Sequence, residues 1–439
     1  MNIDPVLIGS LAIIVSVLLM FAGLQVSFSM LFVGIVGLIM LRSPTAAFQA
    51  VSSDMFQTFS SYGLSVAPLF AMMGFLASFS GIGKSLFDMI DKFVGHIKGG
   101  LALSTQLACT GFGAICGSIP AAITTMTAVA YPEMQNREYS PRLSTATIAA
   151  GAAMAVIIPP SAAMIIFGIA TEQSIGRLFL AGIVPGIILL LFYICAIFIT
   201  LKRHPDYAPT APKSSWNERI SSLKRGGVLE VAVIFVITLG GMFVGWFTPT
   251  EAAAVGAFST LLITAAERRI IFKDVINSLF RATKLAAMVF LLVASASVFG
   301  RMITLSGLPL RLAGYVATLD VPGWVIVAAI VLIYFVLGLF MDELSMILIT
   351  IPLFYPIICG TLGYEPAWFG IMSVLCMILG ALTPPCGMNL FVIKACIKEM
   401  KLTDLYIGIV PYVCAILALI VLLIAFPQVA LFLPNLAMG

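Results

Sequence analysis

The chain has 439 residues, of which 61% are hydrophobic and only 10% are charged, and its mean hydropathy is +1.13. This composition excludes a soluble globular protein and predicts an all-α polytopic membrane protein in a lipid bilayer. The formal net charge of +4 indicates basic loops on one membrane face rather than affinity for nucleic acid.

The first half of the chain, residues 1–201, is predicted to combine membrane spans with helices that lie on the membrane surface. Ser43–Tyr62 and Lys84–Lys98 mix large apolar side chains with polar or charged ones, so both are expected to be amphipathic arms. The apolar runs interpreted as spans are Val6–Phe21, Phe28–Leu41, Leu64–Phe79 and Leu178–Leu201.

Two segments of the first half are interrupted. Residues 101–134 break at Gly117-Ser118-Ile119-Pro120, and neither arm is long enough to span comfortably, so a re-entrant hairpin is predicted. Residues 143–171 contain Pro159-Pro160, which removes two backbone hydrogen bonds and is expected to break a membrane helix. A plain proline kink is the alternative interpretation of one such site.

A hydrophilic stretch rich in Lys and Arg, residues 202–227, is predicted to be a cytoplasmic linker. Residues 228–439 then repeat the order of elements, with a second hairpin at 325–358 and a second broken helix at 367–396 that contains Pro384-Pro385. The remaining elements predicted in this half are spans at Leu229–Trp246, Glu251–Ala266, Leu285–Phe299 and Ile407–Phe432, and arms at Glu267–Arg281 and near Arg311.

Matched positions in the two halves indicate an internal repeat. The matched pairs are Gly81 and Gly307, Tyr131-Pro132 and Tyr355-Pro356, Pro159-Pro160 and Pro384-Pro385, and Pro185 and Pro411. Members of a pair lie about 225 residues apart, an offset that is hard to obtain by chance in apolar sequence. Because each half has an odd number of passes, the two repeats are predicted to be inverted, with both termini in the periplasm.

Each Pro-Pro break is expected to expose backbone groups that can bind ions. Helices restart after Pro160 and after Pro385, and their free N–H groups carry partial positive charge that favours an anion. The carbonyl oxygens before each break have the opposite polarity and suit sodium, which is a hard cation. Two matched breaks at equivalent places predict the binding site of a transporter.

The breaks and the hairpin tips supply the candidate site residues. Sodium, at two sites or more, is predicted to be bound by Gly117, Ser118, Ile157, Ile158, Pro159, Gly338, Asp342, Leu382, Thr383 and Pro384. A small organic anion is predicted to be bound by Pro120, Pro160, Ser161, Ala162, Ser345, Pro385, Cys386 and Asn389.

Asp342 and Glu343 are the only adjacent carboxylates in the chain, and they follow the long apolar run Val325–Met341. A charged residue at membrane depth costs at least about 2.5 kcal/mol, so it is rarely found there without a function. Our hypothesis places Asp342 at the tip of the second hairpin, Gly338–Ser345, near a sodium ion. The alternative is that both carboxylates are solvated at the membrane interface.

Other sites are excluded by absent motifs. Gly83-Lys84-Ser85 resembles the end of a phosphate-binding loop, but Ser78 stands where its first glycine belongs and a span precedes it, so no nucleotide is predicted. Neither G-x-S-x-G nor H-E-x-x-H occurs, which argues against proteases of those types. The eight cysteines form no C-x-x-C pair, so neither a disulfide framework nor a zinc site is predicted.

The two halves resemble the large membrane subunit of tripartite ATP-independent periplasmic (TRAP) transporters. The phrases that carry the resemblance are Gly117-Ser118-Ile119-Pro120-Ala121-Ala122, Ala149–Gly186, Met341-Asp342 and Thr383-Pro384-Pro385. The resemblance implies sodium-driven uptake of a small organic anion across the bacterial inner membrane by an elevator motion. It also implies two partners, a periplasmic substrate-binding protein and a separate small membrane subunit of four helices.

Three alternatives stay open at this stage. A sodium–dicarboxylate symporter would show the same hairpins but would need no binding protein. An ion channel is disfavoured because channels usually form their pore from a symmetric oligomer, whereas this chain carries its symmetry internally. An intramembrane enzyme is disfavoured because nucleophile and metal motifs are absent. C4-dicarboxylates, sialic acid and sulfonates would all suit two helix N-termini.

Overall fold

The computed structural model describes residues 4–210, 213–224, 227–385 and 387–438, and these residues form helices and turns with no strand. The predicted all-helical class is therefore confirmed. By length and apolar composition, five helical stretches could cross a membrane: Tyr62–Phe79, Ile175–Arg203, Phe272–Leu305, Glu343–Thr361 and Leu402–Ala425. Shorter apolar helices lie beside them, and large side chains such as Phe56 and Leu310 are mostly exposed, as expected of a surface that faces lipid.

Four helices of the first half, α1, α3, α9 and α10, begin at a residue whose side chain caps the helix. At α3, Ser43 accepts a hydrogen bond from the Ala46 N–H (3.3 Å), and Pro44 occupies the first helical position. At α10, Ser174 accepts a hydrogen bond from the Arg177 N–H (3.3 Å). The helices are α1 Pro5–Phe21, α2 Val26–Leu41, α3 Pro44–Phe59, α4 Val66–Phe79, α5 Ile82–Val94, α6 Gly100–Cys116, α7 Ile119–Asn136, α8 Pro141–Ala153, α9 Ala162–Ala170 and α10 Ile175–Arg203.

The second half follows a short helix, α11 Trp216–Lys224, that lies within the linker. A π-helical turn, Val236–Gly240, joins α12 to α13, and another, Pro356–Thr361, follows α18. The helices are α12 Val228–Phe235, α13 Gly241–Phe243, α14 Pro249–Ala266, α15 Phe272–Leu305, α16 Leu308–Thr318, α17 Gly323–Gly338, α18 Glu343–Tyr355, α19 Pro366–Leu382, α20 Met388–Cys396, α21 Leu402–Ala425 and α22 Gln428–Met438.

Two predicted boundaries differ from the structure. The arm at 267–281, from Phe272 onward, and the span at 285–299 form one continuous helix, α15, because no proline lies between them and a change in polarity does not break a helix. The last span, 407–432, is divided between α21 and α22 at Pro427. The residue before a proline disfavours helical backbone, and Phe426 accordingly leaves the helix at φ −134° and ψ 76°.

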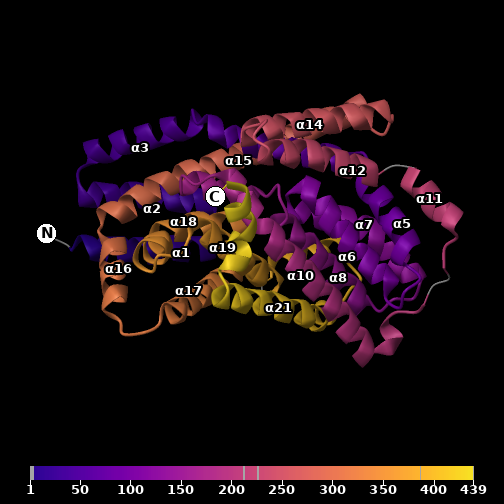
Figure 1. Ribbon diagram of the computed structural model, residues 1–439. Coiled ribbons are helices and arrows are strands. Elements are labelled where there is room, and N and C mark those ends of the chain that lie inside the picture. The colour runs from indigo at the N-terminus through magenta and orange to yellow at the C-terminus, as the bar shows by residue number, and fades with distance from the viewer. Residues whose placement is uncertain (1–3, 211–212, 225–226, 386, 439) are drawn as a thin grey trace.

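Helix contacts occur in matching pairs, some between the two halves and some within each half. α2 packs on α15 while α4 packs on α14, and α6 packs on α8 while α17 packs on α19. The short helix that follows each Pro-Pro break packs on the hairpin of the other half: α9 packs on α18, and α20 packs on α7. In Figure 1, α3, α14 and α15 lie along the upper edge, α16 lies at one end, and α5 and α11 lie at the other.

Two ion pairs join the halves at equivalent helix ends. Arg142 at the start of α8 binds Asp404 at the start of α21 (2.8 Å), and Arg177 at the start of α10 approaches Glu365, the N-cap of α19 (3.4 Å). Each pair therefore connects the broken helix of one half to the last long helix of the other half. All four side chains are partly exposed, so each pair contributes at most about 1 kcal/mol.

Candidate functional site

The tip of the first hairpin touches the first Pro-Pro break through backbone atoms. Gly117, between α6 and α7, has left-handed backbone at φ +59°, and a Cβ added to it would lie 2.8 Å from the Pro160 carbonyl oxygen. Ser118 follows in extended conformation as the N-cap of α7, with Pro120 in the first turn. Only glycine satisfies both the backbone angle and this close approach.

The first break separates α8 from α9 by a short non-helical segment. A 3₁₀ turn, Met154–Val156, ends the first part, and the N–H groups of Ile157 and Ile158 still donate to the Met154 carbonyl (3.2 and 3.0 Å). The buried Ser161 hydroxyl then caps α9 by accepting from the Met164 N–H (3.3 Å). The Pro159-Pro160 peptide bond is cis, as is Pro384-Pro385.

The first break is also held against α10. A Cβ on Gly182 of α10 would lie 2.6 Å from the Ile157 carbonyl oxygen. The Ile157 carbonyl, one of the predicted sodium ligands, is therefore packed closely against the α10 backbone.

Asp342 shapes the tip of the second hairpin. It is the N-cap of α18, and its carboxylate accepts hydrogen bonds from the N–H (3.2 Å) and the hydroxyl (2.5 Å) of Ser345. The preceding helix ends at Gly338, where an added Cβ would lie 3.1 Å from Cα of Gly380 on α19. The second hairpin is thus fixed to the second broken helix by close backbone contact.

The second break uses several of its predicted ligands in internal hydrogen bonds. The Thr383 hydroxyl donates to the Leu379 carbonyl (2.5 Å), and the Thr383 carbonyl accepts from the Gly387 N–H (3.0 Å). Tyr406 donates to the Pro385 carbonyl (2.8 Å). Asn389 is 6% exposed, and its Nδ2 finds no partner among the described residues. Cys386, a predicted substrate ligand, lies outside the described residues.

A small cavity of about 60 Å³ lies where both hairpin tips meet the first break. Of the predicted site residues, Gly117, Ser118, Pro160 and Ala162 line it. Residues 382–385 of the second break do not, so the structure does not bring the two breaks together around this space. The cavity is large enough for a few water molecules.

Eleven of the fifteen residues that line this cavity were not part of the predicted site. They include Phe70 on α4, Leu285 on α15 and Glu343 in the first turn of α18. The apolar residues gave no sequence signal that separates them from ordinary lipid-facing positions. Glu343 did give one, because it is a charge beside a long apolar run.

Helix α4 also contacts the first hairpin directly. A Cβ on Gly74 would lie 2.6 Å from the Cys116 carbonyl oxygen, and the Ser78 and Thr125 hydroxyls are hydrogen-bonded at 2.9 Å.

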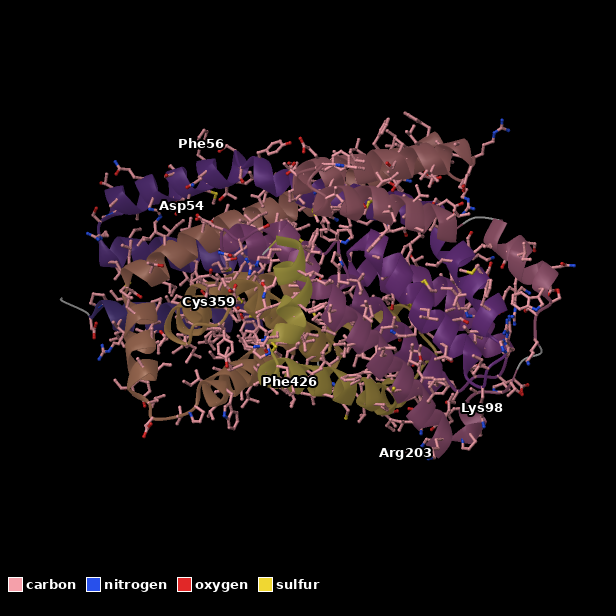
Figure 2. The ribbon with its side chains drawn as sticks, in the orientation of Figure 1. Asp54, Phe56, Lys98, Arg203, Cys359 and Phe426 are labelled. Carbon is pink, nitrogen blue, oxygen red and sulfur yellow. The ribbon has the colours of Figure 1, made fainter. Side chains whose placement is uncertain are left out.

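A larger cavity, of about 410 Å³, lies between α3, α9, α15 and α18 and includes Asp54 (labelled in Figure 2) and Arg301. Nε of Arg301 donates to the Asp54 carboxylate (2.8 Å).

Comparison with known proteins gives a match along almost the whole chain. Residues 13–429 match the family described as "Tripartite ATP-independent periplasmic transporter, DctM component". A C4-dicarboxylate TRAP transporter large permease protein of Pseudomonas aeruginosa is 32% identical over 90% of this chain and 92% of its own. The ectoine TRAP large permease protein of Halomonas elongata is 36% identical over 85% and 86%. A sialic acid TRAP large permease protein of Vibrio cholerae is 32% identical over 96% and 97%.

The fold is also similar to solved membrane transporters of low sequence identity. The Alcanivorax borkumensis YdaH transporter superposes with a TM-score of 0.61 at 15% identity, covering 88% of this chain and 89% of its own. Neisseria gonorrhoeae MtrF superposes with a TM-score of 0.59 at 14% identity, covering 99% and 96%. These likenesses concern the fold alone. The family match and the relatives above 30% identity go further: this chain belongs to the DctM family of TRAP transporters and is a membrane permease, not an enzyme.

Proposed function

We propose that this chain imports a small organic acid by sodium-coupled transport as the large subunit of a TRAP complex. The observation that carries the proposal is the cavity between the hairpin tips. The first turns of α7, α9 and α18 all contribute to its wall, through Ser118, Ala162 and Glu343. The N-terminus of α18 is capped by the Asp342 carboxylate, but the N–H groups at the starts of α7 and α9 that lack a helical partner favour a carboxylate or sulfonate in this space.

Sodium coupling is proposed from the oxygen atoms of the two breaks and tips. Among the described residues, the carbonyl groups of Pro159 and Pro384 at the two breaks accept no backbone hydrogen bond, and hard cations select such oxygen ligands. The residues present therefore fit a sodium ion, with Ile158, Pro159 and the Gly117–Ser118 turn near the first break, and Leu382–Pro384 near the second. Sodium bound there would offset the charge of the imported acid.

An elevator motion is proposed because each hairpin packs on the broken helix of its own half and on the short helix of the other half. Those cross-contacts would let the hairpins and broken helices of the inverted repeats, 1–201 and 228–439, move as one body. Helices α4 and α15, which close the cavity with Phe70 and Leu285, would belong to the stationary part.

The partners and the location are proposed from the family. Large TRAP components work with a small membrane subunit and a periplasmic binding protein, so we propose both for this chain, in the bacterial inner membrane. Lys98 and Arg203 lie toward one end of the molecule and Asp54 toward the other (Figure 2), and α11 of the basic linker lies at the same end as Lys98. That end would be cytoplasmic, with both termini periplasmic.

Uptake is expected to require sodium and not ATP. The test reconstitutes the large and small subunits in proteoliposomes, adds the cognate binding protein, and uses the acid that raises the melting temperature of that binding protein most in a screen of organic acids. An inward sodium gradient should drive accumulation, and replacing sodium by potassium should abolish it. Accumulation driven by a proton gradient in sodium-free buffer would refute sodium coupling, and uptake without the binding protein would favour a stand-alone symporter.

The proposed orientation predicts which loops are accessible from outside. In a cysteine-free background, Ser215→Cys in the linker should not react with an impermeant maleimide in right-side-out vesicles, but should react after permeabilisation. Asp320→Cys, in the exposed turn before α17, should react in intact vesicles. Rapid labelling at Ser215 and protection at Asp320 would reverse the orientation.

A further inference from the structure

Glu343 adds a carboxylate to the cavity between the hairpin tips. Without it, the helix N-termini would give this cavity a positive electrostatic potential. Glu343 is the one residue among the described cavity-lining residues that carries a formal charge, and it is half-buried in the first turn of α18. Among the described residues, its carboxylate forms neither a hydrogen bond nor an ion pair, whereas the neighbouring Asp342 is fully used as a helix cap. A carboxylate without a partner in such a place is either protonated or neutralised by a cation that binds beside it.

The basic side chains of α15, which packs beside the cavity, do not supply such a cation. Arg301 on α15 is bound to Asp54, and Arg281 lies over the Phe79 ring. Lys284 precedes the cavity residue Leu285, but it is exposed and does not line the cavity. A cation that pairs with Glu343 would therefore come from outside the described protein.

We propose that the partner is part of the substrate, and that the imported acid is a zwitterion whose cationic group binds Glu343. This inference rests on the proposed function. The helix N-termini of α7 and α9 would bind the carboxylate or sulfonate, and the Glu343 carboxylate would bind an ammonium or amidinium group of the same molecule. A dicarboxylate would place its second negative charge in the same small space as Glu343, which like-charge repulsion disfavours.

Sodium is the competing partner, and the lining of the cavity argues against it. Ser118 is the one hydroxyl among the described lining residues, and most of the others are apolar side chains such as Phe70 and Ile165. A hard cation needs several oxygen ligands, and apart from the backbone carbonyl groups already proposed for sodium at the Gly117–Ser118 turn and the first break, this wall offers few. A substrate that combines a carbon skeleton with one cationic group suits an apolar cavity that contains a single carboxylate.

The first test identifies the class of substrate. The cognate binding protein is screened by thermal shift with acids that differ only in an ammonium or a hydroxyl group: taurine and isethionate, β-alanine and 3-hydroxypropionate, aspartate and malate. A wider set of amino acids, betaines, cyclic amidinium acids and simple carboxylates is screened alongside. The proposal expects the strongest ligand to carry a cationic group. A strongest ligand without one, imported by the wild-type complex, overturns it.

The second test changes Glu343 in the complete complex. With the imported zwitterion, Glu343→Gln should lower the uptake rate at a fixed concentration of loaded binding protein by at least about tenfold, because one partner of a buried charge pair is lost. The sodium concentration for half-maximal uptake should not change. Glu343→Asp, which keeps the charge, should retain most of the uptake, and Asp320→Asn, which removes an exposed carboxylate before α17, should match the wild type.

The outcomes separate this inference from the proposed function. If Glu343→Gln raises the sodium requirement and leaves substrate preference unchanged, Glu343 is a sodium ligand and the inference is wrong, while sodium-coupled import stands. If Glu343→Gln transports the zwitterion as well as the wild type, the inference is also wrong. If the wild-type complex shows no sodium-dependent uptake of any acid that its binding protein binds, the proposed function itself fails.

Discussion

Gly117→Ala is expected to reduce uptake sharply while the protein still inserts and folds. The substitution has two costs. Left-handed backbone at φ +59° costs an alanine about 1 kcal/mol, and the new Cβ would lie 2.8 Å from the Pro160 carbonyl oxygen. The second cost cannot be relieved by rotating a side chain, because both atoms belong to the backbone region of the tip and the break. The tip must therefore move away from the cavity that it shares with Pro160.

A matched control separates the two costs. Gly307 has nearly the same backbone angle, φ +71°, but an added Cβ there meets no atom within 4 Å. Gly307→Ala should therefore show the backbone penalty alone, as a small loss of thermal stability with uptake close to that of the wild type. Gly117→Ala should reduce uptake at least about tenfold, the effect of a displacement of about 1 Å at a positioned site. Equal uptake by both variants would mean that the contact between the tip and the break has no role in transport.

The positions at which helices end could be predicted from sequence because they depend on local backbone chemistry. Proline lacks the backbone N–H donor and fixes φ. The helices α8 and α19 therefore end before Pro159-Pro160 and Pro384-Pro385 for reasons that do not depend on tertiary packing. Gly117-Ser118 ends one helix and begins the next for equally local reasons. Changes in polarity carried less information, which is why α15 continues through a boundary predicted from charge.

The composition of the site could be predicted only in part, because it depends on how distant helices pack. The sequence indicated both breaks equally, yet only the first lines the cavity with the two tips. Asp342 and Glu343 are adjacent, and the sequence favoured Asp342 as the site residue, but Asp342 caps α18 through Ser345 whereas Glu343 lines the cavity. No periodicity or motif encodes which of two neighbouring side chains faces a space formed by α4, α9 and α15.

Asp342→Ala is expected to reduce uptake sharply without preventing insertion, since it removes a charge from an apolar segment. The carboxylate holds the N–H and the hydroxyl of Ser345, and losing a helix cap costs about 1 kcal/mol. The loss falls on the first turn of α18, which carries Glu343 into the cavity. Loosening this turn should therefore lower the uptake rate at least about tenfold, measured in proteoliposomes with the binding protein present.

Asp342→Asn distinguishes a capping role from a role in binding sodium. Asparagine caps helices about as well as aspartate, so its side-chain oxygen can still accept from the Ser345 N–H, but its negative charge is gone. If Asp342 acts only as a cap, Asp342→Asn should keep most of the uptake and the wild-type sodium dependence, and only Asp342→Ala should be impaired. If its charge also helps to bind sodium, Asp342→Asn should need more sodium for half-maximal uptake. Wild-type uptake by both variants would contradict both roles. Asp342 would then be a solvated carboxylate at the membrane interface, and sodium would have to be bound by the backbone carbonyls and Thr383 alone.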